Sequence, residues 1–222
     1  MRQPRHPALL FDLDGTLTDP YEGITRTFGH TLNTLGKPLP DAETLRSWIG
    51  PPLRASLRAY LGDDTLAEEA VTIYRERYLS IGMYENQLYE GIPELLAELQ
   101  ASGIRLYVAT SKFIIPAQGI LDHFGLTRFF VAIIGSTPDD RIGTKAEVIG
   151  AVLDLLSPTE RSASLMIGDT VYDIEGARAH SLPCIAVTYG YGTLDELTEA
   201  NPHALVHSVA DLRDLLCNKE DR

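Results

Sequence analysis

Two acidic residues two positions apart, Asp12 and Asp14, have the spacing of a site that handles phosphate. They end the apolar run Ala8-Leu9-Leu10-Phe11, which has the composition of a buried strand. Side chains alternate along a strand, so both carboxylates are expected on the same side. Like charges this close repel, and a bound divalent cation commonly holds both beside an anionic substrate. The pair therefore predicts a nucleophile site, although acids that merely cap a turn are the alternative.

Three further polar groups follow or end later apolar runs, which extend from Gly103 to Ser111, from Phe130 to Gly135 and from Ser164 to Asp169. The groups are Thr110-Ser111-Lys112, Lys145 and Gly168-Asp169-Thr170-Val171-Tyr172-Asp173. Ligands bind at the carboxyl ends of strands in an open parallel sheet, so one crevice is expected to collect these residues. Acids, a hydroxyl and an amine together are what transfer of a phosphoryl group to a carboxylate requires.

Each later group also has a structural interpretation when it is taken alone. Thr110-Ser111 has the residue types of a helix N-cap, and a lone Lys145 is typical of a solvated lysine in a first helical turn. Gly168-Asp169 fits a turn between a strand and a helix, and the positive end of a helix dipole favours an acid such as Asp173. The order of these groups after the acid pair favours the functional interpretation.

Strand-like and helix-like segments alternate along most of the chain. Two more apolar runs follow the site groups, Pro183 to Thr188 and the shorter Ala204 to Val206. Helical spacing extends over the four segments Ile92 to Ala101, Ile115 to Phe124, Lys145 to Leu156 and Asp173 to Ala179. This alternation predicts an α/β fold with a doubly wound parallel sheet.

The segment from about Pro20 to Tyr89 interrupts the alternation, because it has helical patterns and no convincing strand. Its clearest pattern is one helical face formed by Ala67, Ala70, Val71, Tyr74 and Tyr78. Glycine and proline clusters divide the segment into three or four helices. We therefore predict an α/β core domain of residues 1–19 and 90–222, with an all-helical insert of residues 20–89.

Composition restricts the class of protein. The chain has 222 residues, of which 44% are hydrophobic and 23% charged, which is ordinary for a globular protein. No apolar run is long enough to span a bilayer or to serve as a signal peptide, so we expect a cytoplasmic protein without membrane contact. A net charge of -12 opposes binding to polynucleotides. Cys184 and Cys217 are expected to be reduced and non-catalytic.

The four polar groups, in this order, resemble the motifs of the haloacid dehalogenase (HAD) superfamily. That family has an Asp-x-Asp-x-Thr string, a Ser or Thr after the second strand, a Lys, and Gly-Asp with a further Asp. The resemblance covers the sheet domain from Leu9 to about Val187, and the helical insert resembles the C1 cap of phosphoglycolate phosphatase-like members. It implies an enzyme that hydrolyses phosphoric monoesters.

The resemblance implies a role for each catalytic residue. Asp12 would attack phosphorus and form an aspartyl-phosphate. Asp14 would protonate the departing oxygen and then activate the hydrolytic water. Thr110, with Ser111 beside it, would bind the phosphoryl oxygens, and Lys145 would steady both the nucleophile and the transferred group.

The resemblance also implies a Mg²⁺ cofactor. Asp12, the backbone carbonyl of Asp14, and Asp169 would hold the ion, with Asp173 acting through water. Oxygen ligands of this kind suit Mg²⁺, which keeps some of its waters and bridges to phosphate.

The insert is expected to select the substrate, because the sheet motifs contact only phosphate and metal. Candidate substrate contacts are Tyr21, Glu22 and Arg54 of the insert and Lys112 of the core. Asp-Gly-Thr-Leu-Thr-Asp, Ile-Gly-Pro-Pro-Leu, Thr-Ser-Lys and Tyr-Gly-Tyr-Gly resemble stretches of bacterial HAD 5'-nucleotidase-like proteins. The expected partner is therefore a small phosphorylated metabolite, first a nucleoside 5'-monophosphate and second 2-phosphoglycolate.

Two alternatives from other classes stay open. A phosphosugar mutase on the same scaffold would move the phosphoryl group to a sugar and not to water. A receiver-like signalling domain would carry phospho-Asp as its signal, although its acceptor follows the third strand and it lacks a long helical insert.

Overall fold

The computed structural model describes residues 6–137 and 141–217. They form two compact units: the described residues of 1–18 and 88–222 make unit 1, and residues 19–87 make unit 2. The chain therefore leaves unit 1 after Thr18 and returns to it at Leu88, close to the predicted domain boundaries. The assignment of these units to a catalytic core and a substrate-selecting insert stays a prediction.

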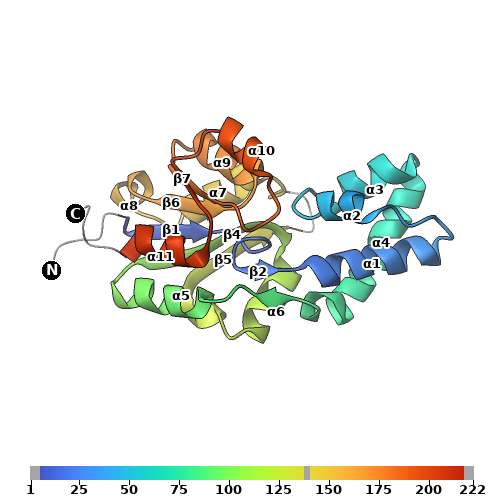
Figure 1. Ribbon diagram of the computed structural model, residues 1–222, viewed down its shortest axis with the longest axis horizontal. Coiled ribbons are helices and arrows are strands. Elements are labelled where there is room, and N and C mark those ends of the chain that lie inside the picture. Colours follow the sequence, from blue (N-terminus) through green and yellow to red (C-terminus); the bar gives the residue numbers. More distant parts are fainter. Residues whose placement is uncertain (1–5, 138–140, 218–222) are drawn as a thin grey trace. The chain divides into compact units, whose positions relative to one another are not determined.

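Unit 1 is built on a parallel sheet with the strand order β5-β4-β1-β6-β7-β8 (Figure 1). Its strands are β1 (Ala8–Phe11), β4 (Arg105–Phe113), β5 (Phe130–Ser136), β6 (Leu165–Gly168), β7 (Cys184–Val187) and β8 (Ala204–Val206). All four residues of β1 are buried, as expected for a strand covered on both faces. The predicted α/β fold with a parallel sheet is confirmed.

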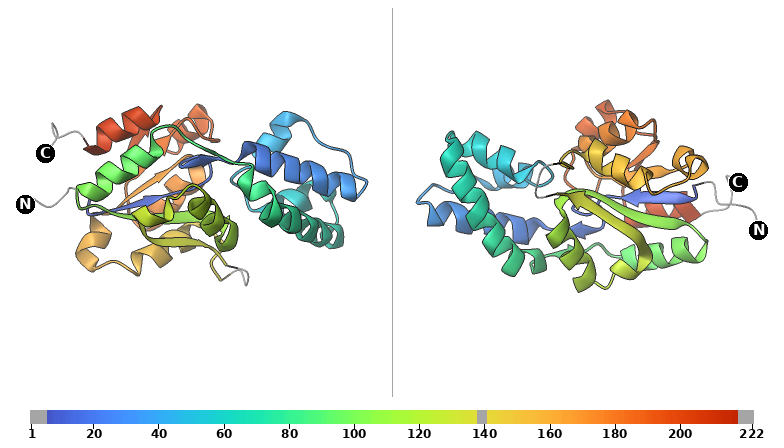
Figure 2. Two further views of the ribbon diagram at one scale, coloured as in Figure 1. Left: turned by 90° about the horizontal axis from the view of Figure 1, so that it is seen from below. Right: turned by 180° about the vertical axis from the view of Figure 1, so that it is seen from behind.

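Helices cover both faces of this sheet. They are α5 (Ile92–Ala101), α6 (Ile114–His123), α7 (Lys145–Leu153), α8 (Pro158–Ser162), α9 (Val171–Ala179), α10 (Leu194–Glu199) and α11 (Val209–Cys217), with a short 3-10 turn, η2 (Thr127–Phe129). Figures 1 and 2 show α7 and α9 on one face and α5, α6 and α11 on the other. The face beneath α7 and α9 has a continuous apolar core that includes Leu10, Tyr107, Val148, Met166 and Ile174.

The register of the central strands places the end of β1 beside the end of β6 and beside the middle of β4. Phe11, the last residue of β1, lies opposite Val108 of β4 and Ile167 of β6. The N–H of Asp12 donates to the carbonyl of Ile167 over 2.9 Å, so pairing continues one residue beyond the strand. The residues that follow these three positions therefore reach the same edge of the sheet.

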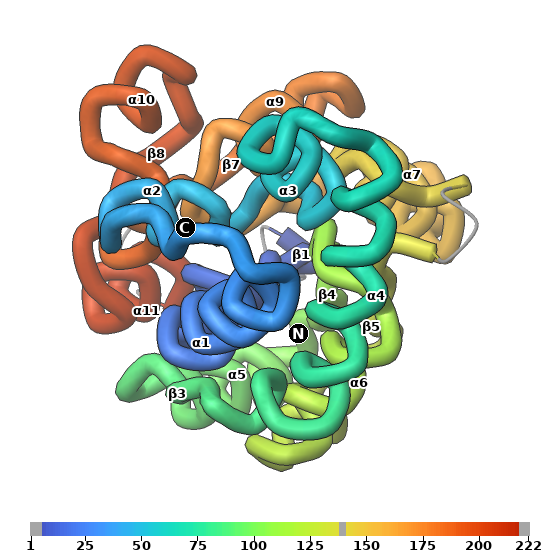
Figure 3. The backbone as a smooth tube through the Cα atoms, turned by 90° about the vertical axis from the view of Figure 1, so that its right-hand side faces the viewer, coloured from blue at the N-terminus to red at the C-terminus, as the bar shows by residue number. Residues whose placement is uncertain are grey.

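Unit 2 is helical. Its helices are α1 (Tyr21–Thr34), α2 (Ala42–Ser47), α3 (Leu53–Leu61) and α4 (Asp64–Ser80), followed by the 3-10 turn η1 (Gly82–Tyr84). Helix α4 packs against α1 and α3 (Figure 3). Its buried residues are those of the predicted face, Ala67, Ala70, Val71, Tyr74 and Tyr78. The predicted helical insert is therefore confirmed.

A small sheet lies where the chain passes between the units. It pairs β2 (Thr18–Asp19) with β3 (Gln87–Leu88). The expectation of no strand between Pro20 and Tyr89 is therefore wrong for β3. A strand of two residues is too short to show the side-chain alternation that identifies strands in a sequence.

Among the described residues, no helix is both long and apolar enough to cross a membrane. Cys184 and Cys217 form no disulfide within the described residues.

Candidate active site

A buried lysine joins two acids at the carboxyl edge of the sheet. Lys145 Nζ lies 2.6 Å from Asp12 Oδ1 and donates to the carbonyl of Ala109 over 3.0 Å. The same nitrogen lies 2.8 Å from Asp173 Oδ1, so one ammonium group pairs with two carboxylates. Asp12 and Lys145 are only 7% and 6% exposed. Their charges therefore interact in surroundings of low dielectric, where the interaction is stronger than in water.

Local sequence places Lys145 in this position. It is the first residue of α7, and a capping box between Thr144 and Glu147 fixes the start of that helix. Helix α9 passes close to the lysine stem, since a Cβ built on Gly176 would lie 2.8 Å from Lys145 Cγ. The interpretation of Lys145 as a solvated first-turn lysine is therefore wrong.

Burial and charge act on the protonation of this cluster. Burial raises the pKa of Asp12 to about 6, Lys145 opposes that rise, and Asp173 adds to it. Burial also raises the pKa of Asp169 well above its ordinary value, and its acidic neighbours raise it further. Burial lowers the pKa of Lys145, but Asp12 and Asp173 raise it by more, so the ammonium stays charged. The acids outnumber the lysine, and a further cation would relieve the excess negative charge.

Asp173 both caps a helix and pairs with the buried lysine. Its Oδ2 accepts from the N–H of Thr170 over 3.0 Å, which caps the first turn of α9. Its Oδ1 is the atom that pairs with Lys145. The interpretation of Asp173 as a helix N-terminal acid is therefore correct, but it is incomplete.

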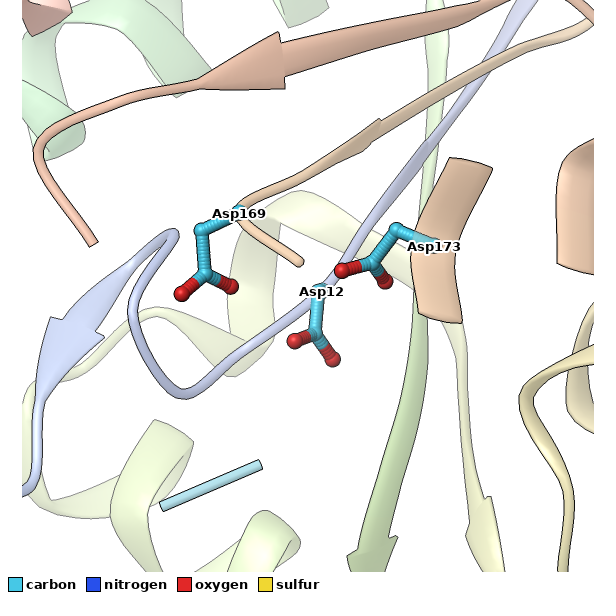
Figure 4. Close-up of side chains that lie close together, drawn as sticks. All are labelled: Asp12, Asp169 and Asp173. Carbon is cyan, nitrogen blue, oxygen red and sulfur yellow. The ribbon is translucent and has the colours of Figure 1, made fainter. Parts of the chain in front are cut away.

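Three carboxylates form a group with the spacing of a metal site. Asp12, Asp169 and Asp173 are buried, and each offers one oxygen within 4.8 Å of the others. Figure 4 shows these carboxylates side by side, from the end of β1, the end of β6 and the first turn of α9. Oxygen donors with excess negative charge fit a hard divalent cation such as Mg²⁺. The residues therefore fit the metal that the sequence predicts.

The turn after Asp12 packs closely against Asp169. Gly15 has φ +85°, and a Cβ at that position would lie 2.0 Å from Asp169 Oδ2. Thr16 Oγ1 donates to the other oxygen, Asp169 Oδ1, over 3.3 Å. Only glycine provides both this backbone conformation and this close approach.

The second acid of the opening pair has its own lysine. Lys112 Nζ donates to Asp14 Oδ2 over 2.6 Å, and the two side chains are 8% and 14% exposed. The sequence suggested Lys112 only as a substrate contact. The structure instead pairs it with the residue expected to act as the acid.

The hydroxyl expected to bind phosphate lies on the adjacent strand. Thr110 is 2% exposed, and its Oγ1 accepts from the N–H of Lys112 over 3.2 Å. A hydroxyl that accepts this bond keeps its own proton for another acceptor. Strand β4 continues through Ser111 to Phe113, so the interpretation of Thr110-Ser111 as a helix N-cap is wrong. Phosphate binding by Thr110 and Ser111 stays a prediction.

The candidate substrate residues of the insert belong to unit 2. Tyr21 and Glu22 line a hollow of about 410 Å³ there, together with Arg26 and residues 84–87. Glu22 pairs with Arg26 over 3.1 Å on the surface. Arg54 pairs with Glu68 over 2.8 Å, and both of these side chains are also exposed. Their contact with a substrate stays a prediction.

Sequence reasoning missed one segment of the site. The N–H of Tyr191 donates to Asp169 Oδ2 over 2.8 Å, so the residues after β7 also contact the acidic cluster. The rule that ligands bind at strand ends could have found them, because Tyr189-Gly190-Tyr191-Gly192 follows an apolar run. In the sequence, this segment contributes only to the family resemblance.

Comparison with known proteins shows relatives that match nearly the whole chain. The chain is 45% identical over 213 residues to a 5'-nucleotidase of Pseudomonas aeruginosa, covering 96% of both proteins. It is 39% identical to tyrosine-protein kinase PtkA of Mycobacterium tuberculosis, covering 94% of this chain and 72% of that protein. It is 32% identical to a phosphoglycolate phosphatase of Colwellia psychrerythraea, covering 91% and 93%.

A solved structure and a family pattern also match this chain and point to the same group of proteins. The crystal structure of a predicted phosphatase from Clostridium acetobutylicum matches with a TM-score of 0.88 and 40% identity, covering 95% of this chain and 97% of that one. The family pattern of the haloacid dehalogenase-like hydrolases matches residues 9–187. This range includes Asp12, Asp169 and Asp173 of the acidic cluster. The resemblance seen in the sequence is therefore confirmed, and the chain belongs to the haloacid dehalogenase-like hydrolases.

Proposed function

We propose that this protein hydrolyses a small phosphomonoester with the help of Mg²⁺, through an aspartyl-phosphate intermediate. The observation that carries the proposal is the buried contact of Asp12 with Lys145, 2.6 Å apart, beside two more carboxylates. A carboxylate held by a charged lysine is anchored as a nucleophile, and the lysine can also neutralise an incoming phosphoryl group.

The first half of the reaction transfers the phosphoryl group to the protein. A carboxylate oxygen of Asp12 forms a bond to phosphorus, and the bond between phosphorus and the ester oxygen of the substrate breaks. Asp14 gives its proton to that departing oxygen, which leaves as an alcohol. The Thr110 hydroxyl and the Lys145 ammonium compensate the charge on the phosphoryl oxygens.

The second half returns the protein to its starting state. Asp14, now deprotonated, takes a proton from a water molecule while the water oxygen bonds to phosphorus. The bond between phosphorus and the Asp12 oxygen breaks, which releases inorganic phosphate and restores both acids.

Metal binding is assigned to the carboxylates of Asp12 and Asp169 and the backbone carbonyl of Asp14, with Asp173 acting through water. When bound, Mg²⁺ neutralises the phosphate and lets it approach the acidic cluster. The support for this assignment is the set of buried oxygen donors and the raised pKa values of Asp12 and Asp169.

A nucleoside 5'-monophosphate is the first candidate for the substrate. The support is the 5'-nucleotidase relative, which matches this chain across both domains that the sequence predicts. 2-Phosphoglycolate is the second candidate, supported by the more distant phosphoglycolate phosphatase relative. Tyr21, Glu22 and Arg54 are the proposed substrate contacts, whereas Lys112, which pairs with Asp14, is proposed to orient that acid.

Transfer to an acceptor other than water is the alternative activity. An aspartyl-phosphate can pass its phosphoryl group to a sugar hydroxyl, as in a mutase, and a relative of this chain is named a tyrosine-protein kinase. The receiver alternative has lost support, because the chain belongs to a family of hydrolases.

A phosphate-release screen tests the proposal. Nucleoside 5'-monophosphates, 2-phosphoglycolate and sugar phosphates are each supplied with Mg²⁺, and free phosphate is measured over time. Asp12→Asn should abolish release, and EDTA should abolish it until Mg²⁺ is restored. Asp195→Asn alters an exposed acid of α10 and should change nothing.

Separate reactions distinguish the alternatives within the same screen. A sugar bisphosphate requirement for turnover would favour the mutase, and label moving from ATP to a tyrosine peptide would favour the kinase. Full activity of Asp12→Asn would contradict all aspartyl-phosphate mechanisms at once.

A further inference from the structure

The segment Tyr189-Gly190-Tyr191-Gly192, which follows β7, is fitted closely around Asp169. The N–H of Tyr191 donates to Asp169 Oδ2 over 2.8 Å, and the N–H of Gly192 donates to the Asp169 carbonyl over 3.1 Å. A Cβ on Gly190 would lie 2.3 Å from Asp169 Oδ2, and one on Gly192 would lie 2.3 Å from the carbonyl. The two glycines therefore allow the backbone to reach one acidic residue from two sides.

The side chain of Tyr189 reaches the opposite side of the same carboxylate through Thr16. The Tyr189 hydroxyl donates to the carbonyl of Thr16 over 3.0 Å. Thr16 in turn donates from Oγ1 to Asp169 Oδ1 over 3.3 Å. Asp169 is thus held at both carboxylate oxygens, once directly by the segment and once through Thr16.

These bonds close a ring that joins distant parts of unit 1. The ring runs from Tyr189 to Thr16, from Thr16 to Asp169, and from Asp169 back to Tyr191. Tyr189 and Thr16 are 173 positions apart in the chain. A ring of this kind restricts the position of the Asp169 carboxylate more than either bond alone.

A second tyrosine supports the first from the side. The ring of Tyr89 meets that of Tyr189 edge to face, with centroids 4.8 Å apart. The N–H of Tyr89 donates to the carbonyl of Leu17 over 3.2 Å, next to the residue that accepts from Tyr189. The Tyr189 ring is therefore packed against a residue whose backbone is itself bonded to the turn.

We propose that Tyr189 is a positioning residue for the metal site. Its hydroxyl holds the turn of Gly15 and Thr16, and through Thr16 it holds the Asp169 carboxylate in the orientation that binds the metal. Tyr189 itself supplies no metal ligand. This inference rests on the metal site of the proposed function and assigns a role to a residue outside the family motifs.

The size of the effect follows from comparable sites. Mutation of a residue that orients a metal ligand without contacting the metal lowers metal affinity or activity by about 10- to 100-fold. Tyr189→Phe removes the hydroxyl and keeps the ring, so the packing against Tyr89 is retained. We expect Mg²⁺ to bind this variant about tenfold more weakly than the unmodified chain.

Calorimetric titration of the purified full-length chain with Mg²⁺ measures this directly, without turnover. Tyr60→Phe is the matched control, because the Tyr60 hydroxyl also donates to a backbone carbonyl, that of Pro38 in unit 2, over 3.0 Å. Its Mg²⁺ affinity should equal that of the unmodified chain. Thr16→Val removes the next bond of the ring and should weaken Mg²⁺ binding as Tyr189→Phe does.

The possible results separate this inference from the proposed function. Asp169→Asn should lose Mg²⁺ binding, and failure of the unmodified chain to bind Mg²⁺ would overturn both proposals. Unchanged affinity of Tyr189→Phe in a chain that does bind Mg²⁺ would overturn the positioning role alone, even if its melting temperature falls. If Tyr189→Phe does not fold, unchanged affinity of Thr16→Val decides against the role in the same way.

Discussion

Lys112 and Asp14 form a largely buried ion pair, with Nζ and Oδ2 2.6 Å apart. The other carboxylate oxygen of Asp14, Oδ1, is also buried and has no hydrogen-bond partner among the described residues. Asp14 is thus held in one orientation by a cation, while its Oδ1 makes no hydrogen bond within the described residues. A group that exchanges a proton with a departing oxygen, and then with water, needs a fixed orientation and one oxygen that is not committed to another bond.

Replacing Lys112 with Met should therefore lower kcat more than it changes KM. We expect a loss of about tenfold in kcat, because a mobile Asp14 protonates the departing oxygen less often in the right geometry. Steady-state kinetics with the best substrate of the phosphate-release screen measures both constants. Lys112→Arg should restore part of the loss. A rise in KM at constant kcat would instead assign Lys112 to the substrate, as the sequence suggested.

Removing the charge of Lys145 should affect stability as well as activity. Lys145→Met leaves the carboxylates of Asp12 and Asp173 without their shared cation. Loss of one partner from a buried ion pair costs about 3–5 kcal/mol, so the free energy of unfolding in EDTA should fall by about that amount. Urea denaturation measures it, with Lys37→Met as an exposed-lysine control. Equal stability of the two variants would contradict the buried pairing.

Two glycines with similar positive φ angles allow backbone strain to be distinguished from steric blockage of the metal site. Gly15 has φ +85° and Gly103 has φ +80°, but only at Gly15 would a Cβ meet Asp169. Alanine at either position should lower the free energy of unfolding by about 1–2 kcal/mol through backbone strain. Only Gly15→Ala should also lose the rise in melting temperature that Mg²⁺ causes. A normal Mg²⁺ response of Gly15→Ala would show that Asp169 is not a ligand.

The sequence predicted the acids of the site because their signal is local. Asp12 follows an apolar run of four residues, and Asp169 and Asp173 follow another. A parallel sheet brings the ends of such runs to one edge whatever the detailed register. Thr110 was found in the same way.

The lysines and the tyrosine segment depend on contacts between distant elements. Lys112 belongs to β4 only because that strand continues as far as Phe113, which pairs with Ser136 of β5. The burial of Lys145 depends on another helix, whose Gly176 lies close to the lysine side chain. The role of Tyr189 depends on which strands lie beside β1, and periodicity within one segment does not carry that information.

The raised pKa values of the acidic cluster give a pH dependence for metal binding. The pKa of Asp12 is raised to about 6, mainly by burial, so the metal-free protein holds a proton there below that pH. A metal binds the deprotonated carboxylate and must displace that proton. The affinity for Mg²⁺ should therefore be greatest above pH 7. Below pH 6, the affinity for Mg²⁺ should fall by up to about tenfold per pH unit when one proton is displaced.

The same shift has the opposite effect on the metal-free protein. A carboxyl whose pKa is about 6 in the folded chain, against 3.8 as its ordinary value, binds more protons when folded. The free energy of unfolding in EDTA should therefore decrease as the pH rises from 4 to 6. Calorimetric titrations with Mg²⁺ at pH 5.5 and 7.5, in buffers of different ionisation enthalpy, count the protons released. Constant affinity without proton release would mean that Mg²⁺ does not bind at Asp12.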